Sequence, residues 1–232
     1  MQRARRIGST QLALHFPSVG GARRGAGRKP KGARAMAPHS ARPTLSRHHP
    51  VHVTTRLVSG LPRLRHPAEI EAIRRAFSAG AERFGCRLVH YSIQDDHLHL
   101  LVEAEGTESL SRGVKGLLVR IARALNRLWH RKGRVFADRF YAHVLRTPRE
   151  VRNALVYVLN NARKHIGRYV GIDPASSGMA FDGWTRPAQH AGRRRDTGPP
   201  PVRAARTWLL TVGWRRHGRI DPAETPRRSL SS

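Results

Sequence analysis

The segment QDDHLHLLVEA, from Gln94 to Ala104, decides how the fold of this chain is interpreted. Its apolar residues recur at every second position, which predicts a half-buried strand. These apolar residues are Leu98, Leu100 and Val102. Successive side chains of a strand point to opposite faces, so His97 and His99 project together from the other face. Two imidazoles about 7 Å apart, at roughly 3.3 Å per residue, can bind one metal ion. A lone His-x-His pair is more often two solvated histidines, so a metal site needs further residues from elsewhere in the chain.

Composition indicates a partner rich in negative charge. The 232 residues include 44 Lys and Arg against 15 Asp and Glu, a formal net charge of +29 with the histidines neutral. Such an imbalance opposes compaction unless a polyanion is bound, which favours nucleic acid. No apolar run is long enough to span a bilayer, and we expect no membrane partner. The single cysteine, Cys86, excludes an intramolecular disulfide framework and a Cys-rich zinc site. We therefore expect a cytoplasmic, nucleoid-associated protein.

Composition also divides the chain into four parts. Residues 1–47 read as a basic disordered arm, with the Gly-rich run GGARRGAGRKPKGAR at 20–34. Residues 48–170 carry the periodic apolar pattern of a folded domain. Residues 171–206 read as a basic linker rich in Pro and Gly, and residues 207–232 as an apolar and basic tail. The tail begins with TWLLTVGWRRHG, which either packs back on the domain or contacts a partner; core packing is the better interpretation.

The elements of the domain follow one another in the order strand, helix, strand, strand, helix, strand, helix. The predicted strands cover 49–57, 87–94, 97–104 and 139–146, and the first helix runs from Pro67 until Gly85 ends it. The first six elements match a split β-α-β pattern. The fold class predicted is α+β: a ferredoxin-like antiparallel sheet with helices on one face, followed by a C-terminal helix and flanked by basic disordered tails.

The second predicted helix, at 107–131, has a buried stripe and an opposite basic face. A charged stripe is often only a solvated face, but this one has almost no acidic residues to compensate it, which favours contact with phosphates. The predicted DNA-binding residues are Arg112, Lys115, Arg120, Arg123, Arg127 and Arg131.

The last predicted helix begins with a capping box at Thr147 and Glu150 and extends to about residue 165 or 166. Tyr157 lies one turn before Asn161, so their side chains share a face, and Lys164 lies on the same side. A tyrosine at the edge of an apolar stripe is usually a core residue with its hydroxyl in water. A functional role becomes the better interpretation only if the helix lies against the His-x-His strand.

The order of the elements, His97-Leu98-His99 and the phrase YVLNN at 157–161 together resemble the HUH single-strand DNA transposases that carry one catalytic tyrosine. Within that group the chain looks most like the REP-associated tyrosine transposases, over residues 47–167. The resemblance implies a nuclease that cuts and rejoins single-stranded DNA beside hairpins or palindromic repeats. It also implies Tyr157 as the nucleophile and His97, His99 and Asn161 as metal ligands.

Some roles stay open at this point. Relatives often have Asn before the first histidine, where this chain has Asp96, so a carboxylate could also reach the metal. Tyr157 needs activation, from the metal, from a water or from a basic neighbour such as Lys164. Two imidazoles with oxygen donors suit Mg²⁺ or Mn²⁺, although imidazole also accepts zinc. The protein is expected to be a monomer or a homodimer.

Two other functions compete with the transposase. One is a non-catalytic nucleic-acid-binding protein derived from a transposase, for which the charge of +29 is sufficient. The other is a phosphodiesterase that uses water as its nucleophile, which ranks last because the chain lacks a second His-x-His motif or an acidic cluster of the kind that two-metal hydrolases use.

Overall fold

A computed structural model of the chain describes residues 44–161, 171–186 and 200–226. All of them belong to one compact unit, residues 37–232. Its centre is a five-stranded sheet with the order β2-β3-β4-β1-β5 and only antiparallel pairs. The strands are β1 (Val51–Arg56), β2 (Glu82–Arg83), β3 (Cys86–Ile93), β4 (His97–Ala104) and β5 (Tyr141–Val144). Without the short β2, this is the strand order of a ferredoxin-like sheet, so the predicted fold class is confirmed.

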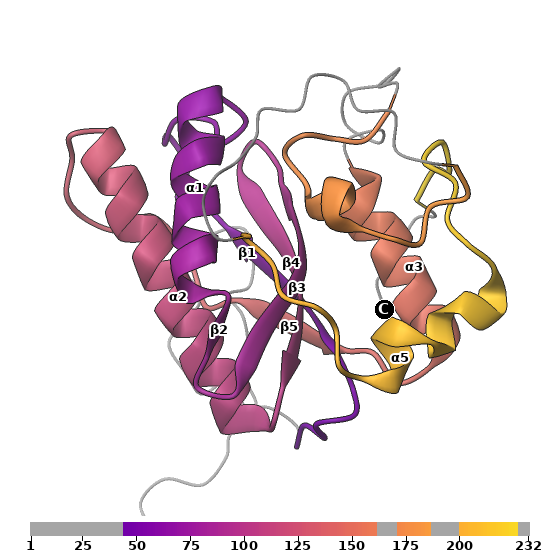
Figure 1. Ribbon diagram of the computed structural model, residues 1–232. Coiled ribbons are helices and arrows are strands. Elements are labelled where there is room, and N and C mark those ends of the chain that lie inside the picture. The colour runs from indigo at the N-terminus through magenta and orange to yellow at the C-terminus, as the bar shows by residue number, and fades with distance from the viewer. Residues whose placement is uncertain (1–43, 162–170, 187–199, 227–232) are drawn as a thin grey trace, which may run out of the picture. The chain divides into compact units, whose positions relative to one another are not determined.

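Two helices, α1 (Pro67–Gly80) and α2 (Thr107–Leu128), pack against each other and cover one face of the sheet (Figure 1). Leu98, Leu100 and Val102 of β4 are buried in the core on this side, as their alternation predicts. Apolar residues of α2 complete that core, because they recur on one face of the helix. These residues are Leu110, Val114, Leu117, Leu118, Ile121 and Leu125.

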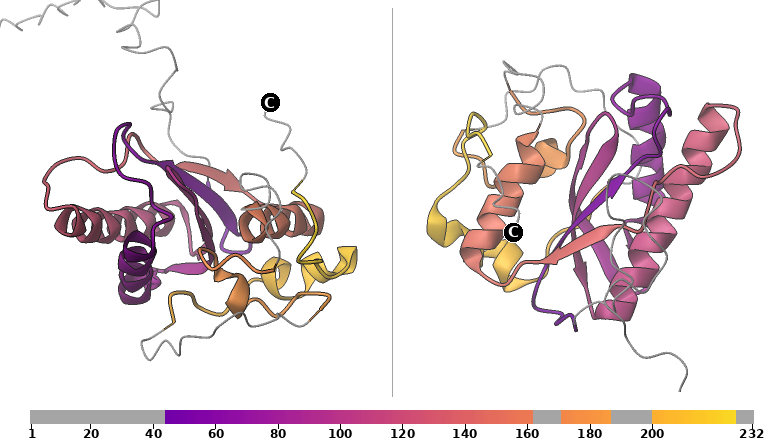
Figure 2. Two further views of the ribbon diagram at one scale, coloured as in Figure 1. Left: turned by 90° about the horizontal axis from the view of Figure 1, so that it is seen from above. Right: turned by 180° about the vertical axis from the view of Figure 1, so that it is seen from behind.

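The helix α3 (Pro148–Leu159) covers the opposite face of the sheet, together with the C-terminal segments (Figure 2). Its start is fixed by the predicted capping box, in which the Thr147 hydroxyl accepts from the Glu150 N–H and the Glu150 carboxylate accepts from the Thr147 N–H. The tail adds a short helix, α5 (Trp208–Thr211), and a 3₁₀ turn, η2 (Gly213–His217). A second apolar core lies on this side of the sheet, around α3, and Trp214 of η2 is fully buried in it. The core-packing interpretation of the tail is therefore confirmed.

The range 171–206, whose composition predicts a linker, contributes packed residues where the structure describes it. It contains the 3₁₀ turn η1 (Ser177–Ala180), and Phe181 and Trp184 lie in the core beside α3. Further on, the Arg203 N–H donates to the Leu88 carbonyl at 2.8 Å. Of the predicted arm, residues 44–47 are described, and Leu45 is buried with its N–H bonded to the Thr107 hydroxyl at 3.0 Å.

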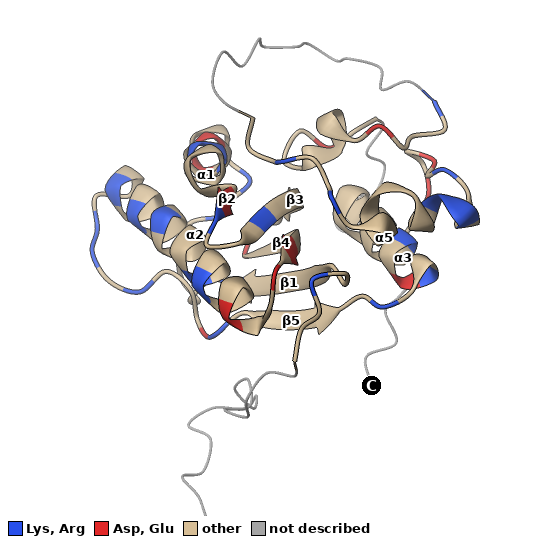
Figure 3. Ribbon diagram, turned by 60° about the horizontal axis from the view of Figure 1, so that its bottom comes forward, with Lys and Arg blue, Asp and Glu red and all other residues tan. Residues whose placement is uncertain are grey.

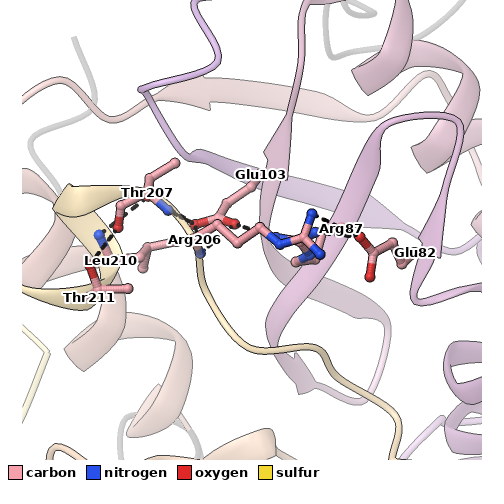
Figure 4. A network of polar contacts seen from close by, with 7 residues as sticks. All are labelled: Glu82, Arg87, Glu103, Arg206, Thr207, Leu210 and Thr211. Carbon is pink, nitrogen blue, oxygen red and sulfur yellow. Dashed lines mark hydrogen bonds and ion pairs between the residues drawn. The ribbon is translucent and has the colours of Figure 1, made fainter.

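A buried carboxylate attaches the tail to the sheet (Figure 4). Glu103 of β4 accepts hydrogen bonds from the Arg206 N–H, the Thr207 N–H and the Thr207 hydroxyl, at 2.8 to 3.0 Å. On its other side Glu103 lies 3.5 Å from Arg87, which also forms an ion pair with Glu82. Because a buried carboxylate is stable only when it is bonded and paired, this network fixes where the tail begins.

Three helices end earlier than their patterns predict. The first ends at Gly80 because Glu82 and Arg83 pair with β3, and the hairpin turn puts Phe84 and Gly85 at positive φ. The second ends at Leu128, so Arg131 lies beyond it. The third ends at Leu159, with Asn160 outside the helical region of the backbone.

Within the described residues, no helix is long and apolar enough to cross a membrane.

Candidate metal and tyrosine site

His97 and His99 lie on the face of the sheet that α3 covers, as the strand alternation predicts. Their rings are 4.7 Å apart between centroids and nearly perpendicular, at 87°. The pairing of β4 with its neighbour β1 places Arg56 opposite His97 and Thr54 opposite His99. The two imidazoles are thus carried by a strand that is bonded on both sides, which limits their movement.

An acidic side chain holds His97. Its Nδ1 lies 2.6 Å from the Asp96 carboxylate, which also forms an ion pair with Arg56. Burial raises the pKa of the Asp96 carboxyl, but the hydrogen bond with His97 and the charges of Arg56 and His97 outweigh it, so the pKa is lowered. Asp96 is therefore a carboxylate at neutral pH. Its contact with Nδ1 leaves Nε2 as the nitrogen of His97 that can bind a metal.

Residues of β1 hold the buried His99. Its Nδ1 lies 3.2 Å from the Nε2 of His52 and 3.2 Å from the Thr54 hydroxyl. Burial lowers the pKa of His52 to about 4, with a smaller contribution from His143. His52 and Thr54 were not among the predicted site residues. Their signal was present in the sequence, because an antiparallel partner of β4 must put its own alternate residues on the face of the histidines.

Tyr157 reaches this pair from α3. Its ring is 4.9 Å from the ring of His99 and 5.7 Å from that of His52, edge-on in both cases. Burial raises the pKa of the Tyr157 phenol above its ordinary value of 10. The neutral phenol is therefore the resting form, and a group that accepts its proton is needed before it can act as a nucleophile. The helix does lie against the His-x-His strand, which was the condition for a functional interpretation.

Asn161 is fully buried, and neither atom of its side-chain amide has a hydrogen-bond partner within the described part of the chain. A buried amide without partners is costly, so its presence calls for an explanation such as a bound ion. The preceding Asn160 differs, since its amide donates to the carbonyls of Asp221 and Glu224 at 3.1 and 2.9 Å. Lys164, the proposed activator of the tyrosine, lies outside the described residues.

The donors at this site suit a divalent cation. The ligand beyond the two imidazoles would be an amide rather than a third histidine or an acid. No group of three or more His, Cys, Asp or Glu side chains forms a metal site among the described residues. Two imidazoles, each with a partner at Nδ1, supply nitrogen donors, and the buried Asn161 amide, which has no partner among the described residues, supplies an oxygen donor. That combination suits Mg²⁺ or Mn²⁺, and imidazole also accepts zinc.

The basic face of α2 is present on the other side of the sheet (Figure 3). Arg112 stacks on the exposed Phe84 at 4.9 Å and is 3.4 Å from Glu108. Arg120 donates to the carbonyl of Gly116. Arg131 is a correction, because it lies in the connection after the helix and bonds to the carbonyl of Arg134. The remaining predicted residues, all exposed on α2, are Lys115, Arg123 and Arg127.

A groove runs beside this basic face. It has a volume of about 570 Å³ and is bounded by α2 and by the connection from α2 to β5. Phe136 and Phe140 form part of its floor, and Lys115, Arg134 and Arg139 stand at its edge. Aromatic rings bordered by cations are the combination that binds single-stranded nucleic acid.

Comparison with known proteins agrees with this fold. The family described as "Transposase IS200 like" matches residues 52–161, from His52 on β1 to Asn161. Over this range the chain is similar to the IS200-like transposases. Among solved structures, the chain is similar to one described as a REP-associated tyrosine transposase bound to a REP hairpin, with a TM-score of 0.53 and 17% identity. The alignment covers 72% of this chain and all of the other. No curated protein matches the sequence.

Proposed function

We propose that the protein cuts and rejoins single-stranded DNA, with Tyr157 as the nucleophile and a divalent cation bound by His97, His99 and Asn161. The observation that carries the proposal is the contact of the Tyr157 ring with His99, which itself lies against His97. A phenol beside two imidazoles, on a domain similar to the IS200-like transposases, has the composition of a phosphodiester-transfer site.

The reaction conserves the ester bond. The Tyr157 oxygen bonds to the phosphorus while the bond from phosphorus to the 3′ oxygen breaks, giving a 5′-phosphotyrosine and a free 3′-hydroxyl. A later 3′-hydroxyl attacks the same phosphorus, releases the tyrosine and rejoins the strand. The bound cation supplies Lewis-acid polarisation of the phosphate and offsets the charge that develops on it. The phenol proton leaves to a base, for which Lys164 or a water is proposed.

Asp96 is proposed as a positioning residue for His97 rather than as a ligand. Its carboxylate already contacts His97 Nδ1 and forms an ion pair with Arg56. A carboxylate in that position orients the imidazole and raises its basicity toward a metal on the other nitrogen.

The DNA partner is proposed to be a strand that folds into a hairpin or a palindromic repeat. The similar solved transposase is bound to a REP hairpin, and this chain has a charge of +29. Duplex stems would contact the basic face of α2, whereas unpaired bases would stack in the groove at Phe136 and Phe140. The protein is proposed to act at the nucleoid in the cytoplasm. The contact of α3 with its own β4 supports the proposal of a monomer that uses its own tyrosine.

The test is an incubation of the protein with a hairpin oligonucleotide that has single-stranded flanks, in Mg²⁺ or Mn²⁺. Expected products are a cleaved strand with a 3′-hydroxyl and a protein–DNA adduct that survives denaturation. Tyr157→Phe should abolish both while hairpin binding is retained. Tyr141→Phe is the matched control, because Tyr141 is exposed on β5, and it should still form the adduct.

Three other outcomes would replace the proposal. Salt-sensitive binding with no cleavage in any divalent metal would identify a non-catalytic binding protein. Turnover without an adduct, unaffected by Tyr157→Phe, would identify water as the nucleophile. An adduct that persists in Tyr157→Phe would move the nucleophile to another residue.

A further inference from the structure

The two histidines of β4 are held by different kinds of neighbour. The Nδ1 of His97 contacts a charged carboxylate from the preceding residue. The Nδ1 of His99 contacts two neutral groups of another strand, the imidazole of His52 and the hydroxyl of Thr54, both at 3.2 Å. His97 thus has an acidic partner in the residue that precedes β4, whereas the orientation of the buried His99 depends on β1.

The register of the sheet fixes this contact. Thr54 is directly opposite His99 in the pairing of β1 with β4, and His52 lies diagonally from it on the same face. β1 is itself flanked by β4 and β5, so both of its edges are bonded. Because β1 is held on both sides, His52 and Thr54 keep a constant position relative to the His99 ring.

We infer that His52 and Thr54 are positioning residues that select the tautomer of His99. His99 donates its Nδ1–H toward the Nε2 of His52 and the Thr54 oxygen, which leaves the lone pair of its Nε2 for the cation. This rests on the proposed function, since it assigns the nitrogen by which His99 binds the metal. Ligating histidines commonly donate their second ring N–H to a partner that sets ring orientation.

The opposite tautomer would disable the site. If the Nε2–H of His52 donated to His99, the hydrogen of His99 would sit on Nε2 and occupy the position of the cation. The Nε2 of His52, 3.2 Å from the Nδ1 of His99, accepts the Nδ1–H of His99 when the hydrogen of His52 is on its own Nδ1. The Thr54 hydroxyl can accept as well as donate, so it supports the same arrangement when its own hydrogen points elsewhere.

The direct test reads the tautomer of His99 in metal-free protein without DNA. Long-range ¹H–¹⁵N spectra of histidine-labelled protein distinguish a protonated from an unprotonated ring nitrogen. The expected result is hydrogen on Nδ1 and a lone pair on Nε2 of His99. Hydrogen on Nε2 in the unmodified protein would overturn the inference, whatever any variant does.

Variants then assign the cause. The double variant His52→Leu/Thr54→Val should move His99 toward the Nε2–H form and weaken Mn²⁺ binding about tenfold or more by titration calorimetry. His52→Gln, which keeps an acceptor, should retain the tautomer and bind Mn²⁺ within a few-fold of the unmodified protein. His143→Gln is the control, because His143 of β5 lies directly opposite His52 in the pairing of β1 with β5. An unchanged tautomer in a folded double variant would contradict the inference.

The NMR and calorimetry results are independent of the test of the proposed function. If Tyr157→Phe still formed an adduct, the tautomer of His99 would be unaffected and the inference would stand. If His99 carried its hydrogen on Nε2, Tyr157 could still be the nucleophile, with the metal held in another way.

Discussion

Tyr157 and the two β4 histidines are brought together by three separate local rules. Alternation in β4 sends His97 and His99 to one face, and the capping box fixes the start of α3 and therefore the rotation of Tyr157. The second apolar core then presses α3 against that face. The first two rules are visible in the sequence, and together with the second core they explain why the ring of Tyr157 ends 4.9 Å from that of His99.

For Asn161 we predict a substitution that weakens metal binding without lowering the stability of the fold. Its buried amide has no hydrogen-bond partner among the described residues, so Asn161→Ala breaks no hydrogen bond within them. Because a buried amide without hydrogen bonds is costly, we expect the free energy of unfolding without metal to stay the same or to rise by about 1–2 kcal/mol. We also expect Mn²⁺ affinity to fall by at least tenfold, as measured by calorimetry. Asn160→Ala is the control.

The control should behave in the opposite way, because the Asn160 amide bonds to two carbonyls of the tail. It should lower stability by about 1–2 kcal/mol and leave Mn²⁺ affinity unchanged. Full Mn²⁺ affinity in Asn161→Ala would remove that residue from the metal site.

His52 shows the limit of prediction at this scale. The motif at 97–99 identifies a metal-binding pair without any partner strand, because His-x-His is a local pattern. A histidine on β1 becomes part of the site only through register, and a one-residue shift would move it to the other face. Several registers of β1 on β4 are compatible with the apolar pattern alone, so the contact needed the structure.

Among the elements, α3 is the one whose position the function depends on, and the tail holds it. Arg152 of α3 forms a bidentate ion pair with Glu224, at 2.8 and 2.9 Å. It also donates hydrogen bonds to the carbonyls of Gly218 and Arg219. Trp214 packs into the core beside the same helix. The segment that composition sets apart as a tail is thus a brace for the helix that carries the tyrosine.

Arg152→Ala should therefore loosen α3. Removing one partner of a mostly buried, charge-assisted pair costs about 1.5–3 kcal/mol, measurable by urea unfolding. Amide hydrogen exchange should accelerate most in α3 and in residues 213–224. Arg149→Ala is the matched control, since Arg149 is exposed on the same helix, and it should change neither measurement. Equal effects of the two variants would contradict the role of the brace.

For α2, the prediction concerns the salt dependence of DNA binding. Arg123 and Arg127 are exposed on its basic face, and each phosphate contact releases counterions. Arg123→Ala/Arg127→Ala should lower the slope of log Kd against log salt by about 1.5–2 for a hairpin stem. Arg75→Ala on α1 is the control, because Arg75 is already paired with Glu71 at 2.7 Å. An unchanged slope in the α2 variant would place the DNA elsewhere.

At the scale of the whole molecule, the sheet order and the two helices on one face could be predicted from periodicity. The boundaries could not. The first helix was expected to reach Gly85, but pairing of Glu82 and Arg83 with β3 ends it at Gly80. The packed residues beyond 171 were also hidden, because Phe181 and Trp184 are isolated aromatics in a polar, Gly-rich stretch, and burial of single residues leaves no periodic signal.

Two histidines whose pKa is lowered by burial, His52 and His90, make the stability of the whole domain depend on pH. Burial lowers the pKa of His52 and of His90 to about 4, from 6.5 in the unfolded chain. Between these values the unfolded state binds more protons, so stability falls as the pH drops from 6.5 toward 4. At pH 5 each of these histidines should lower the free energy of unfolding by on the order of 2 kcal/mol relative to pH 7.5.

Urea unfolding at a series of pH values, in metal-free buffer, measures this dependence. The variants His90→Gln and His52→Gln should each flatten the decline between pH 6.5 and 5. A decline that is identical in the unmodified protein and in both variants would show that other groups govern acid unfolding.

The measurement that tests the central claim most directly is identification of the residue that bears the DNA. The adduct formed with a hairpin oligonucleotide in Mn²⁺ is digested with nuclease and protease, and the modified peptide is sequenced by mass spectrometry. The account predicts a nucleotide 5′-phosphate on the phenol oxygen of Tyr157, within the peptide that follows Arg152. A nucleotide on Tyr141 or on any other side chain would contradict it.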